Sequence, residues 1–196
     1  MKPALQPLLT ILFSLSCLFP AWAQDAKVRP GKGMDLIPGD FAEYTNTEYV
    51  EGKATKLPST IMMAMGPQGE FEGVVVLVAK GDELSSTQNV LYDLSKEKAK
   101  VGELLEEGKG NLTINGKSYD CSWEKRKNVD TVFTFWNCPA LPFEKYAKVE
   151  VEIKDGKKRI TELVYFGPDT SEDAKSREFQ KRLQKLVKQA AEKTSR

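Results

Sequence analysis

The stretch from Asn111 to Cys138 reads NLTINGKSYDCSWEKRKNVDTVFTFWNC, and it decides the fold that we predict for the chain. Asn115 and Gly116 stand between two alternating runs, and both residues tolerate the positive φ angles of a type I′ turn, so the pattern predicts a β-hairpin. The run from Thr131 to Trp136 is β-branched and aromatic, a composition that favours a half-buried strand. The stretch therefore predicts strand, turn, strand, loop and strand.

The same stretch holds Cys121 and Cys138, the two cysteines that we expect in the mature protein. If they face each other across a hairpin, Trp123 lies opposite Trp136 and the loop between the strands covers about residues 127–131. A disulfide here would contribute about 3 kcal/mol, mostly by restricting the unfolded chain. The alternative is a pair of buried free thiols, and the export signal at the N-terminus favours the disulfide.

The N-terminus has the pattern of a secretory signal peptide, with Lys2, an apolar run from Leu8 to Phe19, and Ala21-Trp22-Ala23. We expect residues 1–23 to be removed after Ala23, which predicts a secreted or periplasmic protein. The alternative is lipidation at Cys17, which would tether the domain to a membrane. Cleavage removes one of the 29 basic residues and leaves 28 against 28 acidic ones, so no net charge draws the protein to nucleic acid.

The rest of the chain divides into three predicted parts: a flexible leader over residues 24–40, a single β-rich domain over 41–191, and a disordered tail over 192–196. The leader is rich in Lys, Gly and Pro and lacks periodicity, so a loosely docked arm is the alternative to a mobile segment. Within the domain, a first helix is expected over Ser95–Glu107, with Ser95 as its N-cap. A C-terminal amphipathic helix is expected from about Ser171 to Ala191.

The predicted fold is α+β: a single curved antiparallel sheet of seven to nine strands, half-barrel like, with one or two helices packed on it. Thr60–Met65 and Val74–Ala79 are continuous apolar runs, which suit strands covered on both faces. An antiparallel sheet closed over a helix can enclose an apolar cavity, although Met also fills irregular core space. The candidates for lining such a cavity are Ile61, Met63, Met65, Val74, Val76, Trp123 and Trp136.

The C-terminal helix has Thr170 as its candidate N-cap, one apolar stripe, and an otherwise basic surface. Its exposed lysines would contact an anionic membrane surface or an acidic partner. The alternative, which we favour, is that the stripe packs on the sheet while the lysines face water. The candidates for an anionic-surface contact are Lys181, Lys185 and Lys188.

The residue inventory disfavours catalysis. The chain has no His, which excludes His general bases, His triads and His-containing zinc sites. Oxidised cysteines would remove the thiol nucleophile, and no glycine loop stands between a strand and a helix as a phosphate site requires. We therefore predict a protein that is not an enzyme, with no catalytic residue, no metal and no cofactor.

Several short motifs resemble a pattern in secreted bacterial β-rich proteins, in which a Trp-containing strand is followed by a Lys-x-Glu strand and a closing strand that ends near Phe-Gly. The resemblance covers about residues 110–167 and implies a curved sheet similar to the half-barrels of periplasmic lipoprotein carriers. It transfers no catalytic residue. The motifs that carry it are Trp136, Pro142-Phe143, Lys148-Val149-Glu150, Glu162-Leu163 and Phe166-Gly167.

The function that we expect is that of a non-enzymatic binding domain outside the cytoplasm, a carrier or sensor of a hydrophobic ligand such as a lipid or an acyl chain. The alternative is an envelope protein-interaction module that uses an edge strand or the basic C-terminal helix. A secreted hydrolase is disfavoured by the residue inventory.

Overall fold

The computed structural model describes residues 27–32, 34, 36–141, 146–167 and 174–194. The predicted signal peptide, Cys17 and Thr170 lie outside the described residues. The elements are β1 (Lys27–Pro30), β2 (Phe41–Val50), β3 (Lys53–Gln68), β4 (Phe71–Lys80), β5 (Glu83–Asp93), β6 (Glu103–Ile114), β7 (Lys117–Asn128), β8 (Thr131–Asn137), β9 (Tyr146–Ile153), β10 (Lys157–Gly167) and α3 (Ala174–Thr194).

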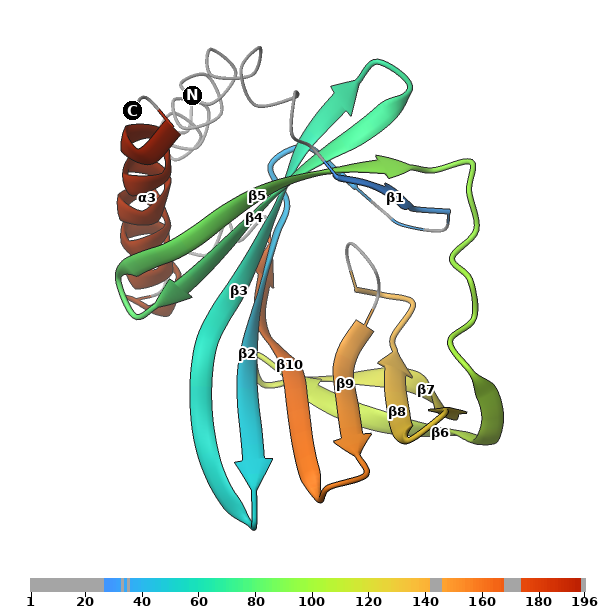
Figure 1. The fold of residues 1–196 in the computed structure, drawn as a ribbon. Helices are drawn as coiled ribbons and strands as arrows, with labels where there is room; N and C mark the ends of the chain where they lie inside the picture. Colours follow the sequence, from blue (N-terminus) through green and yellow to red (C-terminus); the bar gives the residue numbers. More distant parts are fainter. Residues whose placement is uncertain (1–26, 33, 35, 142–145, 168–173, 195–196) are drawn as a thin grey trace.

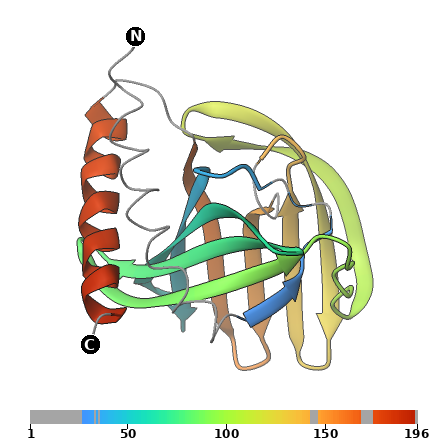
Figure 2. The ribbon, with the colours of Figure 1, turned by 90° about the horizontal axis from the view of Figure 1, so that it is seen from above.

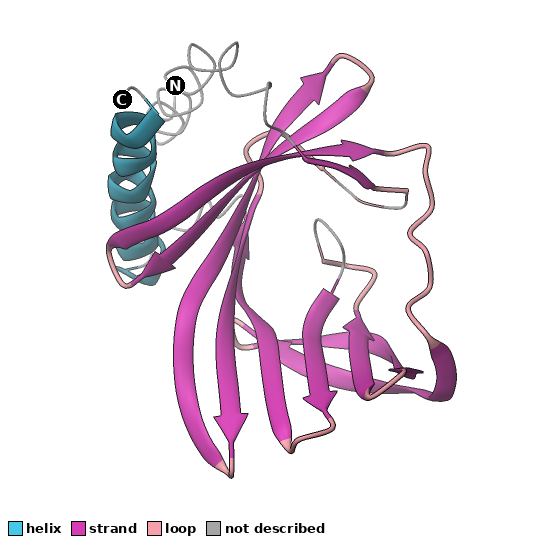
Figure 3. Cartoon of the chain, in the orientation of Figure 1, coloured by secondary structure: helices cyan, strands magenta, loops and turns pink. Residues whose placement is uncertain are grey.

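The ten strands form one sheet in the order β1-β5-β4-β3-β2-β10-β9-β8-β7-β6. Neighbouring strands are antiparallel except β1 and β5, which are parallel. The sheet is strongly curved, and its two ends, β1 and β6, do not pair with each other (Figure 1). Helix α3 lies along one side of this sheet in both views (Figures 1 and 2), and it is the single helix among the described residues (Figure 3). The predicted fold class, a curved and mainly antiparallel sheet with a helix packed on it, is confirmed.

Strands β3 and β4, which are adjacent in the interior of the sheet, bury apolar side chains on both faces. Met63 belongs to a cluster that includes α3, whereas the next residue, Ala64, belongs to a second cluster. Val75 and Val74 are divided in the same way. Because side chains alternate along a strand, the two clusters lie on opposite faces of the sheet. The two continuous apolar runs therefore place apolar side chains in the clusters on both faces of the sheet, as their composition predicted.

The hairpins of the central stretch form as predicted. Asn115 and Gly116 have φ angles of 52° and 74°, so both occupy the left-handed region that the turn needs. Trp123 pairs with Trp136 in the register of β7 and β8. The turn between these strands occupies residues 129–130, inside the loop that we expected.

The helix expected over Ser95–Glu107 is wrong. Residues 103–107 belong to β6, and the residues before them contain no helix. Gly102 has a φ of +68°, and a Cβ there would lie 2.2 Å from the carbonyl oxygen of Lys127 on β7. The chain thus approaches β7 at Gly102 and pairs with it from Glu103 onward, so tertiary pairing overrides the local helix preference of a Lys- and Glu-rich segment.

The strand count of ten exceeds the seven to nine expected, and β1 is the strand that the sequence did not indicate. It lies within residues 24–40, the expected flexible leader, and pairs with β5 from Lys27–Val90 to Pro30–Asp93. The backbone amide of Gly31 then donates to the carbonyl of Asp93 at 2.8 Å. The part of the leader around β1 is thus a docked arm rather than an irregular segment, while the domain boundaries themselves stay predictions.

Candidate functional site

Among the described residues, no helix lies on the face of the sheet opposite α3, which we call the helix-free face, and its apolar side chains are incompletely covered. Among the described residues, its cluster has twelve buried members, and eight further apolar side chains pack against it while staying partly exposed. The cluster that contains α3 also has twelve buried members but only two such neighbours, Met65 and Val187. The eight on the helix-free face are Met34, Leu36, Met62, Val76, Leu112, Tyr119, Trp136 and Phe166. The helix-free face is therefore the less completely covered of the two clusters among the described residues.

The partly exposed apolar surface extends onto β3 and β4, two adjacent interior strands of the sheet. Met62 on β3 pairs with Val76 on β4, and both side chains are partly exposed. The next pair, Thr60 and Val78, is partly exposed too, and Gln88 opposite Val76 on β5 is exposed. Interior strands of a sheet usually bury such side chains, so this is an apolar surface that the described residues do not fully cover.

The seven residues predicted to line one cavity do not lie together. Ile61, Met63 and Met65 face α3 and contribute to its cluster. Val74 and Val76 lie on the helix-free face. Met62, in the same apolar run, was not chosen as a cavity residue, because its side chain could be assigned to a face only once the strand register was known.

The two predicted tryptophans form a pair. Trp136 packs against the helix-free cluster, and Trp123 lies opposite it with a ring-centroid distance of 6.2 Å. A Cβ on Gly108 would lie 2.8 Å from the Trp123 ring, and one on Gly110 would lie 3.1 Å from the Trp136 ring. The two glycines of β6 therefore make room for the two rings.

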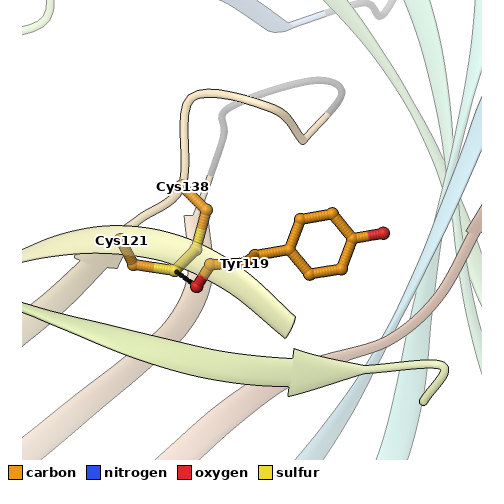
Figure 4. Close-up of a disulfide and its surroundings, with 3 residues drawn as sticks. All are labelled: Tyr119, Cys121 and Cys138. Atoms are coloured by element: carbon orange, nitrogen blue, oxygen red, sulfur yellow. Dashed lines mark hydrogen bonds between the residues drawn. A yellow bond between two sulfur atoms is a disulfide. The ribbon is translucent and has the colours of Figure 1, made fainter. Parts of the chain in front are cut away.

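A disulfide joins Cys121 on β7 to Cys138 at the end of β8, as predicted. Both residues are buried within the helix-free cluster. The Cys121 sulfur lies 3.3 Å from the carbonyl oxygen of Tyr119, and the Tyr119 side chain extends away from the disulfide (Figure 4). The Tyr119 ring then meets Phe166 edge to face at 5.9 Å. The disulfide thus holds one border of the helix-free face together, and it is a bond typical of proteins outside the reducing cytosol.

Helix α3 is fastened to the other face by apolar and polar contacts. Its stripe of Phe179, Leu183 and Leu186 is buried against the sheet. Arg182 forms an ion pair with the buried carboxylate of Glu43 at 2.5 Å and donates to the carbonyl of Gly81 at 2.9 Å. The stripe is therefore occupied by the sheet.

The three lysines proposed for an anionic surface, Lys181, Lys185 and Lys188, are all exposed on α3. Lys185 pairs with Asp82 at 3.1 Å in the turn between β4 and β5. Because the apolar stripe of α3 packs on the sheet, these lysines would contact a membrane only through their charge, without the apolar stripe beside them.

A charged network crosses β9 and β10. Burial by itself would raise the pKa of Glu150, but Lys158 and Lys148 donate hydrogen bonds to this carboxylate, and its pKa lies below the ordinary value. The hydrogen bond to Glu150 raises the pKa of Lys158. Burial would lower the pKa of Lys148, but its bonds to Glu150 and Glu162 raise it. Each charged group here has an opposite partner, so the network is a structural feature.

The described residues line, among others, two cavities, of which the larger is about equally polar and apolar and the smaller is mainly apolar. One, of about 490 Å³, lies where the β3–β4 turn meets the end of β5, and the other, of about 210 Å³, lies between α3 and β10. In the larger cavity, Asp93 accepts hydrogen bonds from Ser95 and Lys96, which lower its pKa. The larger is lined by Gly69, Glu70, Phe71, Glu72, Asp93, Leu94, Ser95 and Lys96, and the smaller by Glu43, Val164, Tyr165, Glu178, Phe179 and Arg182. The apolar opening of the helix-free face is therefore a surface feature distinct from both.

Within the part of the chain that the structure describes, no three Asp, Glu, Cys or His side chains gather as metal ligands do. In the same residues, no helix has both the length and the apolar character needed to cross a membrane.

No protein-family model and no curated protein matches the chain. Among solved structures, it is similar to a domain named for outer membrane lipoprotein sorting from Vibrio parahaemolyticus, with 10% identity and a TM-score of 0.26 over 77% of this chain and 93% of that one. It is also similar to a LolA superfamily protein from Nitrosomonas europaea, with 9% identity and a TM-score of 0.24 over 77% of this chain and 91% of that one. The weak resemblance to a lipoprotein-carrier-like fold that the sequence indicated is thus found again.

Proposed function

We propose that the protein is a non-enzymatic binding domain of the bacterial periplasm or exterior that carries or senses a hydrophobic ligand on its helix-free face. The observation that carries the proposal is the set of eight partly exposed apolar side chains around an otherwise buried cluster. Uncovered apolar surface of this kind costs free energy in water, and a ligand with apolar groups recovers that free energy when it binds.

The contact that the ligand makes is centred on Met62 and Val76. These two side chains are cross-strand partners on β3 and β4, so their exposed surfaces adjoin. Met is flexible and polarizable and adapts to acyl chains of different shape. The disulfide between Cys121 and Cys138 supports an oxidising compartment, where an envelope carrier would work.

Native mass spectrometry of protein purified from a periplasm, before and after extraction with organic solvent, tests the proposal. We expect extra mass that extraction removes, and we expect the extracted protein to bind an apolar fluorescent dye. A charge at the centre of the opening, in Met62→Lys, should abolish both signals because the ammonium group cannot be buried under an apolar ligand.

Val129→Lys provides the matched control, because Val129 is apolar and 81% exposed but lies in the turn between β7 and β8. It should bind the ligand and the dye as the wild type does. Circular dichroism and thermal melting establish that both variants are folded. A wild-type protein without removable mass and without dye binding would refute the carrier function, and equal binding by Met62→Lys would place the ligand elsewhere.

A second function, interaction with an envelope protein through an edge strand, is favoured by the length of β6, which has twelve residues. The basic helix is the weaker candidate for such an interaction, because its stripe is occupied by the sheet. If α3 nevertheless contacts membranes through Lys181, Lys185 and Lys188, binding to anionic vesicles should vanish at high salt and in the triple Gln variant.

A further inference from the structure

The two edges of the sheet are protected to different degrees. Strand β1 has four residues and ends at Pro30, and short strands and proline are two of the means by which proteins block an edge. Strand β6 has twelve residues and no proline, and within the described residues it pairs on one side only, with β7. Its free edge is therefore a row of backbone donors and acceptors that a further strand could pair with.

The side chains of this edge are not those of a simply solvated strand. Leu104 is 42% exposed and Leu105 is 49% exposed, at the start of β6. Glu106, Glu107 and Lys109 follow, all exposed, and none of them has an ion pair within the described residues. The edge thus combines apolar side chains with unpaired charges of both signs, a pattern that suits a specific partner strand.

The sign and spacing of these charges identify the partner as a second copy of β6. Two identical antiparallel strands related by a two-fold axis must place one residue opposite itself, because hydrogen-bonded and non-hydrogen-bonded pairs alternate. An axis at Glu106, Glu107 or Lys109 would set like charges against each other. An axis at Gly108 instead sets Glu107 of each copy opposite Lys109 of the other.

We propose that the protein forms a homodimer in which β6 pairs with β6 of a second copy about Gly108, which joins the two sheets into one. This inference is independent of the proposed ligand. Gly108 has no side chain to obstruct the approach at the axis, and the Trp123 ring on its own sheet already requires a glycine there. The same pairing brings the exposed Leu104 and Leu105 of each copy toward the Leu112 end of β6 in the other copy, which covers apolar surface that a single copy leaves exposed.

The proposed pairing about Gly108 uses the part of β6 in which the pairing with β7 is regular. The register of β6 against β7 shifts between Leu104 and Glu106, which marks a β-bulge at Leu105. Residues 106–110, which hold the axis and both charged pairs, lie beyond the bulge. The charges also favour this register, because an axis one residue to either side sets Glu107 or Lys109 against itself, and an axis at Gly110 forms no charged pair.

Sedimentation velocity of the full mature protein over a concentration series measures the dimer. We expect the wild type to dimerise and Lys109→Glu to raise the dissociation constant about tenfold, since both Glu–Lys pairs become Glu–Glu pairs. Glu107→Lys should weaken the dimer to a similar extent. The double variant Glu107→Lys with Lys109→Glu restores opposite charges in both pairs and should recover the wild-type constant.

Lys117→Glu provides the matched control, because Lys117 is an exposed lysine at the start of β7 and lies away from the proposed axis. It changes the net charge by the same amount and should leave the dimer intact. Circular dichroism and melting temperature confirm that each variant is folded. A wild type that is monomeric at every concentration would overturn the proposal. So would a dimer that ignores the single charge reversals, or a double variant that stays as weak as the single ones.

Discussion

The two faces of the same sheet are completed in different ways. Helix α3 covers one face, and among the described residues only two apolar side chains beside that cluster stay partly exposed. On the helix-free face, eight apolar side chains beside the cluster stay partly exposed. The first face is fastened by the Arg182–Glu43 ion pair, and the second by a disulfide at its border. The difference shows that a covering helix buries the apolar side chains of one face more completely than loops and a disulfide bury those of the other.

The largest effect that we expect on the helix-free face comes from its disulfide. Replacing both Cys121 and Cys138 with Ala should lower the free energy of unfolding by about 3 kcal/mol, because the unfolded chain gains freedom. Urea denaturation of wild type and variant measures the difference. Reduction of the wild type should give nearly the same loss, and an unchanged midpoint on reduction would mean that the disulfide does not stabilise this face.

Two adjacent methionines compare the faces most directly. Met63→Ala removes a side chain that is 7% exposed and packed under α3, so it should cost roughly 2 to 3 kcal/mol of unfolding free energy. Met62→Ala removes the same atoms from the partly exposed position on the helix-free face and should cost about 1 kcal/mol or less. Equal losses in urea denaturation would show that the two faces are equally packed.

The ion pair under α3 should contribute less than the apolar core. Arg182→Met leaves the Glu43 carboxylate, which is 8% exposed, without its cation, and we expect a loss of about 2 kcal/mol. The double variant Glu43→Gln with Arg182→Met should recover part of this loss because no charge is left buried. A double-mutant cycle measures the coupling, and strictly additive losses would contradict a direct interaction.

The smallest effect belongs to the charged network of β9 and β10. Glu150→Gln should cost less than about 1 kcal/mol, since solvent screens these pairs. The lowered pKa of Glu150 means that its contribution is present above its ordinary value of 4.5 and is lost as the pH falls through the folded-state pKa. The raised pKa values of Lys148 and Lys158 mean that their contribution is present below 10.5 and is lost as the pH rises further.

Denaturation of wild type and Glu150→Gln across pH measures this contribution. The gap between the two proteins should be widest in the neutral range and should close toward both extremes. A gap that widens in acid would reverse the expected sign.

Local patterns predicted most of the strands but not which face of the sheet each side chain occupies. Asn115-Gly116 specified its hairpin because few residues tolerate two successive positive φ angles, and the alternation around Trp123 and Trp136 specified their register. The segment around Gly102 was mistaken for a helix because its Lys and Glu content carries no information about the strand β7 that it meets. The candidate cavity residues were divided between faces because a continuous apolar run has no polar side to orient it.

The sequence by itself determined the hairpins, the disulfide pair, the two-sided burial of β3 and β4, and the absence of histidine chemistry, because each depends on residues close together in the chain or on composition. The tertiary structure alone decided which face α3 covers, and hence that Met63 is sealed while Met62 is open. It also decided that β6 ends the sheet and presents Glu107, Gly108 and Lys109 at an edge. Both outcomes depend on contacts between segments far apart in the sequence, and local periodicity does not show which of these segments come together.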